Sequence, residues 1–142
     1  MDELVGSSLV VGAARGRSFV LTQPLSFWGG LDSATGRLID AHHGRMGAVI
    51  AGRVLVMPSG RGSSSSSSVL AEAIRAGAAP AAIVLAEPDP IVALGAIVAR
   101  ELYGITCPII VLPREAHARI PDDIELTVEA ARDGASLRMF GD

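Results

Sequence analysis

The sequence predicts an α/β fold in which a flattened barrel or sandwich of sheets carries helices on its flanks. Three runs of continuous apolar residues, 54–57, 82–85 and 109–112, alternate with stretches of helical pattern. Such strands are typical of a mainly parallel layer that is buried on both faces and joined by right-handed crossovers. Both ends of the chain have β-strand character instead. The 142 residues suit one domain, residues 1–142, with a substantial core.

The first twenty residues predict two short strands. The runs 9–11 (LVV) and 19–21 (FVL) are rich in β-branched, aromatic and aliphatic residues. The stretch from Gly12 to Gly16 lies between them. We therefore expect it to separate the two strands.

The next segment contains the only tryptophan of the chain. Trp28 follows Phe27 and precedes two glycines. We expect both aromatic side chains to anchor the core, in preference to lining the rim of a pocket. Residues 32–36 (DSATG) predict a turn before a short strand at 38–39.

The chain is organised around a strand, a glycine-rich turn and a helix between residues 54 and 77. Pro58 ends the strand because proline cannot donate to a central ladder. Gly60 and Gly62 permit a tight turn and the close approach of a ligand. Six serines follow, 63–68, where the first N–H groups of the helix have no partner and where serine caps best. The apolar residues of this helix share one face: Val69, Leu70, Ala73, Ile74 and Gly77.

This turn is the best candidate for a site. A helix N-terminus attracts anions through its free N–H groups and its dipole. Arg61 adds a planar cation that suits a carboxylate or phosphate. A run of serines is often a flexible linker, but this run lies directly between an apolar strand and an amphipathic helix. We therefore expect a structured loop at a binding site.

The second half of the parallel layer follows in order. The strand 82–85 precedes a helix from 91 to 102, with Pro90 in the first turn and Gly104 at the end. The next strand, 109–112, begins after Cys107, which we expect to be a small buried residue without chemical activation.

The tail returns to residues that alternate in polarity. Glu125 to Ala130 has a period of two. Asp133 and Gly134 are a hairpin signal before a final strand at 136–140.

Composition excludes several classes of protein. The net charge of −3 and the lack of a basic cluster argue against a nucleic-acid partner. The apolar runs around 76–86 and 91–99 are too short to span a bilayer, and the sequence has no basic-then-apolar leader. A single cysteine cannot form an intrachain disulfide, which fits the reducing cytoplasm. We therefore expect a cytoplasmic protein without nucleic-acid or membrane partners.

The histidines do not indicate a metal site. His42 and His43 are adjacent, so their side chains point apart on a strand or loop, and no third ligand has suitable spacing. A role for either as a general base is open. His117 lies between two alanines, and we expect it at the surface without a chemical task.

Three known types of glycine-rich loop between a strand and a helix are excluded, because each requires a residue that this sequence lacks. A phosphate loop requires a lysine before its Ser or Thr, and Gly62 stands there instead. A nucleophile elbow requires glycine two residues after its serine, but Ser65 follows Ser63 at that distance. A dinucleotide fold requires an acidic residue where Ala81 and Ala82 stand.

Four segments together resemble the aconitase X swivel-domain family. They are 25–32 (LSFWGGLD), 35–37 (TGR), 58–64 (PSGRGSS) and 94–100 (LGAIVAR). The resemblance covers about residues 4 to 140, and it implies a swivelling β/β/α domain. In that family the domain is either fused to a larger aconitase-like part or is a separate small subunit beside it. The sequence lacks the large part and so resembles the small subunit.

The resemblance implies a dehydratase. Bacterial members act on cis-3-hydroxy-L-proline and give pyrroline-2-carboxylate, whereas archaeal members act on mevalonate 5-phosphate. Phe27, Trp28 and the serine run followed by 70–72 (LAE) favour the hydroxyproline type, so we expect the small subunit of a two-chain cis-3-hydroxy-L-proline dehydratase. The serine after Gly-Arg-Gly is the proton acceptor in the family, which implies this role for Ser63. Arg61, Gly62, Ser64 and Ser65 would then bind a small anionic substrate. Iron, as a cluster or a single ion, would be held by the large subunit and not by this chain, whose single cysteine agrees with that.

Two alternatives remain open, and a third is excluded. One is the small subunit of a mevalonate 5-phosphate dehydratase. Another is a non-catalytic regulatory module whose serine loop only holds an anion. The third is a swivelling phosphohistidine carrier, because 96–102 (AIVAREL) also resembles the mobile domain of phosphoenolpyruvate-using enzymes. This chain cannot act as such a carrier, because Leu94 occupies the position of the histidine that is phosphorylated in that family.

Overall fold

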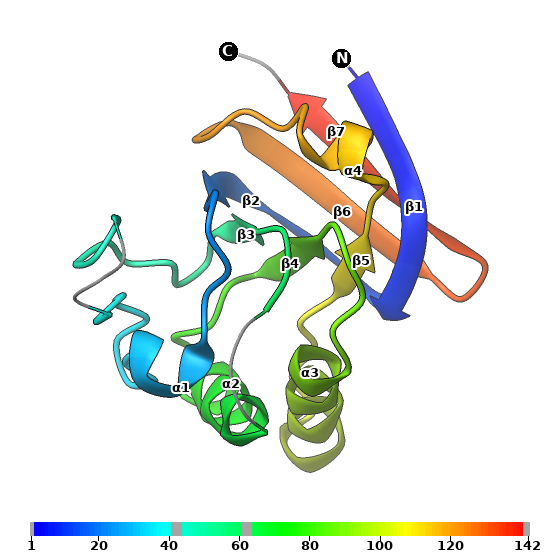
Figure 1. The fold of residues 1–142 in the computed structure, drawn as a ribbon. Helices are drawn as coiled ribbons and strands as arrows, with labels where there is room; N and C mark the ends of the chain where they lie inside the picture. The colour runs from blue at the N-terminus through cyan, green and yellow to red at the C-terminus, as the bar shows by residue number, and fades with distance from the viewer. Residues whose placement is uncertain (1, 41–43, 61–63, 141–142) are drawn as a thin grey trace.

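The computed structural model describes residues 2–40, 44–60 and 64–140. Seven strands of this described part close into one barrel in the order β1-β5-β4-β3-β2-β6-β7. The strands are β1 (Asp2–Val10), β2 (Gly12–Val20), β3 (Val54–Val56), β4 (Ala82–Leu85), β5 (Ile109–Val111), β6 (Glu125–Ala131) and β7 (Gly134–Phe140). The helices are α1 (Phe27–Gly30), α2 (Ser65–Arg75), α3 (Pro90–Tyr103) and α4 (Arg114–His117). Figure 1 shows α1, α2 and α3 grouped at one end and both chain termini at the other.

The predicted parallel layer is confirmed. β2, β3, β4 and β5 are parallel neighbours, and β1 pairs antiparallel with β5. The side chains of β3 alternate between two cores. Val54 and Val56 pack inside the barrel, whereas Leu55 packs toward the helices. Because both faces are buried, each position of these strands must be apolar, which explains the continuous runs in the sequence.

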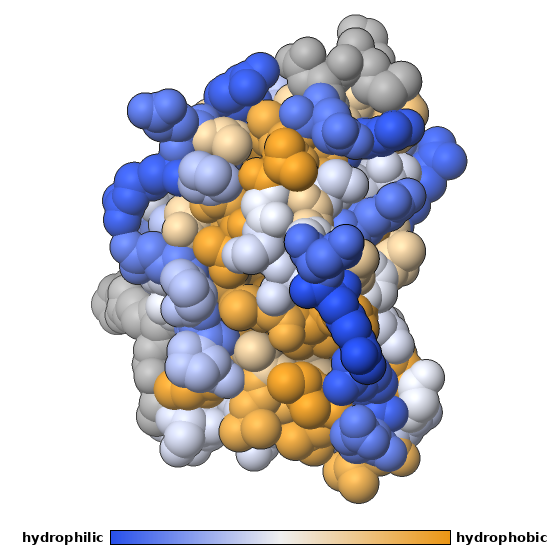
Figure 2. Space-filling view, turned by 90° about the vertical axis from the view of Figure 1, so that its right-hand side faces the viewer, coloured by the Kyte–Doolittle hydropathy of each residue, from blue (hydrophilic) through white to orange (hydrophobic). Residues whose placement is uncertain are grey.

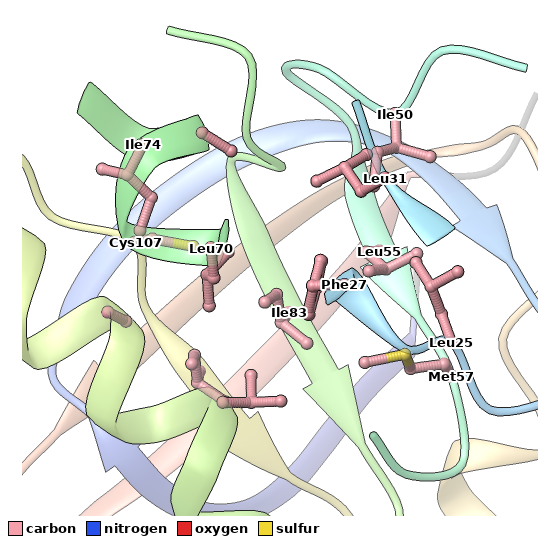
Figure 3. Packing of buried hydrophobic residues seen from close by; sticks show 14 of the residues in the cluster. Leu25, Phe27, Leu31, Ile50, Leu55, Met57, Leu70, Ile74, Ile83 and Cys107 are labelled. Carbon is pink, nitrogen blue, oxygen red and sulfur yellow. The ribbon is translucent and has the colours of Figure 1, made fainter. Parts of the chain in front are cut away.

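The helix-facing core explains the pattern of α2. Figure 3 shows Leu55 and Ile83 of the strands in the same cluster as Leu70 and Ile74 of α2. α2 ends at Arg75, earlier than the predicted face that extended to Gly77. α3 follows the prediction closely: Asp89 caps its first turn and Gly104 closes it in the left-handed conformation, with φ 68°.

The first two strands are longer than predicted. The stretch 12–16, expected to separate two strands, is part of β2. Both strands belong to two sheets: β1 pairs first with β7 and then with β5, and β2 pairs first with β6 and then with β3. The glycines mark close backbone approaches, since a Cβ at Gly16 would lie 2.7 Å from the Gly52 carbonyl oxygen.

The C-terminal hairpin is confirmed. β6 and β7 pair antiparallel in register from Glu125↔Phe140 to Ala131↔Gly134. Leu126 and Val128, two residues apart in β6, both point into the barrel core. The hairpin therefore supplies the antiparallel wall opposite the parallel layer.

The segment between α1 and β3 contains less regular structure than predicted. The turn at 32–36 is present, with the Gly36 N–H donating to the Asp32 carbonyl at 2.8 Å. The predicted strand at 38–39 is reduced to an isolated bridge between Leu31 and Leu38. Among the helices of the described residues, none has the length and apolar character that crossing a bilayer requires.

Candidate active site

The candidate site begins where β3 ends, at the carboxyl edge of the parallel layer. The Met57 N–H donates to the Val84 carbonyl at 3.1 Å. The Pro58 carbonyl accepts the N–H groups of Ala86 and Glu87 at 2.9 and 3.2 Å. The chain that leaves β3 is therefore fastened to the chain that leaves β4. Both open parallel sheets and closed parallel barrels bind their ligands at the carboxyl ends of their strands.

Gly60 fixes the loop against the N-terminus of α3. It forms a parallel bridge with Leu25. A Cβ at position 60 would collide with the Asp89 carboxylate and lie 2.9 Å from the Val92 side chain. Asp89 caps α3 by accepting the N–H groups of Ile91 and Val92 at 2.9 and 3.2 Å. The sequence predicts that the glycines of this turn let a ligand approach the backbone. At Gly60, the group that approaches is the Asp89 side chain, which caps α3.

The described part of the serine run is the first turn of a helix and not a linker. Ser65 to Ser68 belong to α2, and Ser64 is its N-cap residue. Ser64 forms no side-chain cap hydrogen bond with the described residues, so the predicted capping role is wrong for it. The Ser67 hydroxyl instead donates to the Ser64 carbonyl at 2.7 Å. Ser64 and Ser65 are both exposed at the end of the helix.

Ser66 connects α2 to the Phe-Trp-Gly-Gly turn. Its side chain is buried, and its hydroxyl lies 3.4 Å from the Ser26 hydroxyl. The Trp28 N–H donates to the Ser66 hydroxyl at 3.4 Å, and the Ser26 hydroxyl donates to the Trp28 carbonyl at 2.9 Å. These bonds hold the backbone of residue 28 beside the serine end of α2.

The two aromatic residues of this turn have opposite environments. Phe27 is fully buried, as predicted. Trp28 is 61% exposed, so its predicted role as a core anchor is wrong. The turn is not a regular helix, because Trp28 has ψ 119° and Gly29 has φ 79°. This backbone directs two adjacent side chains to opposite sides.

α3 contacts α2 on the side opposite Trp28. A Cβ at Gly95 would lie 2.7 Å from the Ser67 carbonyl oxygen and 3.2 Å from the Leu70 Cβ. Only glycine permits the two helices to lie this close. The serine end of α2 is therefore held by α1 on one side and α3 on the other, which Figure 1 shows.

His117 bonds to the backbone at the end of β3, a role that the sequence did not predict. It is half-buried, and its Nε2 lies 2.9 Å from the Met57 carbonyl and 3.2 Å from the Val84 carbonyl. Both partners are acceptors, so Nε2 carries the proton and donates. His117 joins α4 to the ends of β3 and β4 and lines a pocket of about 310 Å³ with Pro58. The predicted surface position of this residue is wrong, because it is half-buried and its ring bonds to the backbone.

We expect His117→Leu to lower the free energy of unfolding by about 1–3 kcal/mol, because the Met57 carbonyl loses its donor at the end of β3. Chemical denaturation followed by circular dichroism measures this. His117→Gln keeps an N–H donor of similar reach and serves as the control. Equal stability of the leucine variant and the wild type would show that the bond contributes nothing.

The described residues do not fit a site for iron. No group of three or more His, Cys, Asp or Glu side chains within them could hold a metal ion. Cys107 is buried, and its desolvation raises the pKa of the thiol to about 12, so the thiolate that binds metals does not form at neutral pH. Its sulfur points to the Pro80 carbonyl at 3.5 Å.

Several predicted residues lie outside the described part of the chain. These are Arg61, Gly62 and Ser63 of the loop, and His42 and His43. Gly60 and Ser64, the residues on either side of this loop segment, are both described.

Comparison with known proteins identifies similar chains. The family model of the aconitase X swivel domain matches residues 3–137. The chain is 52% identical over 106 residues to a cis-3-hydroxy-L-proline dehydratase of Pseudomonas aeruginosa, covering 75% of this chain and 18% of that protein. It is 42% identical over 127 residues to a phosphomevalonate dehydratase small subunit of Methanothermobacter thermautotrophicus, covering 89% and 92%.

Solved structures agree with these similarities. The crystal structure of Thermococcus kodakaraensis aconitase X in its holo-form matches with a TM-score of 0.86 and 31% identity, covering 99% of both chains. The chain spans only 18% of the length of the two cis-3-hydroxy-L-proline dehydratases that it matches.

Proposed function

The chain belongs to the aconitase X swivel-domain family, and from this membership we propose that it is the small subunit of a two-chain hydro-lyase that dehydrates cis-3-hydroxy-L-proline to pyrroline-2-carboxylate. Residues 1–142 would form one swivel domain, active only with an aconitase X-type large subunit. The 52% identity to a cis-3-hydroxy-L-proline dehydratase carries the choice of substrate. The match to a phosphomevalonate dehydratase small subunit covers 92% of that protein, which favours a small subunit that is separate from the large one.

Ser63 is the proposed proton acceptor. In the elimination, the base removes the proton from the carbon next to the carboxylate, a C=C bond forms, and the C–O bond to the hydroxyl breaks, so that water leaves. A neutral serine is a weak base, so its hydroxyl must be made more acidic by its surroundings. The N-terminal dipole of α2 and the Arg61 guanidinium are the proposed sources of this effect. Gly62, Ser64 and Ser65 would complete the contacts to the substrate.

The geometry of the described residues suits this role. A general base must be held within hydrogen-bond reach of the proton that it removes. Gly60 is fastened to α3 and Leu25, and the serine helix is fastened to α1 and α3. Gly60 and Ser64, the described residues nearest to position 63, therefore both belong to elements that are held in place at the edge of the parallel layer.

We expect Arg61→Ala to raise KM for the substrate about tenfold and to lower kcat, because a guanidinium that pairs with the substrate carboxylate would be lost. Steady-state kinetics of the assembled enzyme measure both constants. Arg75 serves as the control, since it pairs with Glu72 on the exposed face of α2 at 2.6 Å. If Arg61→Ala and Arg75→Ala had the same kinetics, Arg61 would have no role at the site.

Iron is proposed to belong to the large subunit, as a cluster or a single ion. The chemistry of the described donor set agrees with this assignment, because the single thiol is buried and protonated. No step assigned to this chain depends on the metal.

The proposal is tested by co-expressing the chain with an aconitase X-type large subunit. We expect the purified pair to consume cis-3-hydroxy-L-proline and release pyrroline-2-carboxylate, which NMR detects. Each subunit alone should be inactive. Formation of a complex that turns over no substrate would leave the regulatory, anion-binding module as the better interpretation.

Mevalonate 5-phosphate is the second candidate substrate. The similarity to phosphomevalonate dehydratase small subunits extends over more of this chain, 89%, although the identity is lower. The same assay distinguishes the two, since turnover of the phosphate ester without turnover of hydroxyproline would reverse the assignment.

A further inference from the structure

Two large apolar side chains are exposed on either side of the serine end of α2. Trp28 is 61% exposed, and its N–H is bonded to Ser66. Leu94 is 51% exposed and directly precedes Gly95, whose backbone lies against Ser67. Ser64 and Ser65 are exposed at the N-terminal end of α2, and Figure 1 shows α2 between α1 and α3.

The segments next to these residues carry little charge. Residues 22–31, 64–71 and 91–99 contain no Asp, Glu, Lys or Arg. The centres of protein interfaces are depleted in charge and enriched in aromatic residues, and tryptophan is enriched among their strongest contacts. An exposed tryptophan whose backbone is bonded to Ser66 and whose neighbours in sequence are uncharged is therefore typical of a binding surface.

The molecule has a competing apolar surface at the other end of α3. Figure 2 shows a strip of apolar side chains on the side of the molecule that carries this helix. Leu102 and Tyr103 are 67% and 42% exposed at its C-terminal end. Leu102 lies eight residues after Leu94, which is about 12 Å along the helix. Only the surface at Trp28 and Leu94 adjoins the serine end.

We propose that Trp28, Leu94 and the exposed serine end of α2 form the surface that docks onto the aconitase X-type large subunit, with Trp28 as its strongest contact. The inference depends on the proposed function, because a base that acts on substrate held by another chain must lie within the interface. The partner is argued from length: the match covers only 18% of the Pseudomonas aeruginosa dehydratase, so in that protein a much larger part accompanies the matched domain.

The test measures binding of this chain to the purified large subunit by biolayer interferometry. We expect Trp28→Ala to raise Kd about 10- to 100-fold and Leu94→Ala about threefold to tenfold. The concentration of this chain that gives half-maximal dehydratase activity should rise by the same factors. Leu102→Ala is the matched control and should change Kd less than twofold. The thermal midpoints of the variants should remain near the wild-type value, because each side chain is at least half exposed.

The outcomes separate the two proposals. If the wild-type chain binds and Trp28→Ala binds equally well, this surface is wrong and the proposed function stands. A larger loss for Leu102→Ala than for Trp28→Ala would place the interface at the other end of α3. If Trp28→Ala abolished self-association of this chain and left binding to the large subunit intact, a second copy would be the occupant. If the wild-type chain did not bind the large subunit, both proposals would fail.

Discussion

Ser63→Ala is expected to lower kcat of the assembled dehydratase by about two to four orders of magnitude, the usual scale for the loss of a general base. The substituted enzyme should assemble normally, because removal of one hydroxyl leaves the docking surface unchanged. Single-turnover kinetics with cis-3-hydroxy-L-proline would locate the loss in the chemical step. Exchange of the substrate α-proton with solvent deuterium should slow by the same factor.

Ser68→Ala is the matched control, since Ser68 is an exposed residue of the same serine run, within α2. It should keep nearly wild-type turnover. A kcat for Ser63→Ala within threefold of wild type would remove Ser63 from the mechanism.

Gly95→Ala is expected to destabilise the fold and to impair activity together. Its Cβ would lie 2.7 Å from the Ser67 carbonyl, and backbone atoms cannot rotate away as a side chain can. α2 and α3 must therefore separate, at a cost of about 1–3 kcal/mol in the free energy of unfolding. The shift displaces the serine end of α2, and misplacement by about 1 Å is enough to lower turnover up to about 100-fold.

Gly134→Ala provides the comparison for Gly95→Ala. Its nearest neighbour would be the Gly6 carbonyl at 3.8 Å, an ordinary contact. Urea denaturation should distinguish the two variants clearly. If both had the stability of the wild type, the close packing of α2 on α3 would not be what positions the site.

The elements that could be predicted are those with a strong local pattern. Val54 to Val56 are apolar at every position because the strand is buried on both faces, and the short length of the run, its β-branched residues and Pro58 distinguish it from a buried helix. Asp89 and Gly104 define the ends of α3 through local capping chemistry. The C-terminal hairpin has both alternation and a turn signal.

The features that could not be predicted depend on contacts distant in sequence. Nothing local distinguishes Phe27 from Trp28, yet one is buried and the other exposed, because the non-helical backbone at 28–29 decides their directions. His117 bonds to carbonyls 60 and 33 residues away. The glycines of β2 indicate a loop when considered alone, but Gly12 and Gly16 admit close contacts with Thr106 and Gly52, which are distant in sequence.

The pairing of the first strand with the last has a practical consequence. Asp2 lies opposite Met139 in the register of β1 and β7, and Figure 1 places both termini far from α1 and α2. A short peptide could join residues 140 and 2, and new ends could be opened at the exposed turn of residues 132–133, without disturbing the helices. The same arrangement allows attachment to a sensor surface next to residue 2 or residue 140 while α1 and α2 remain accessible to a partner.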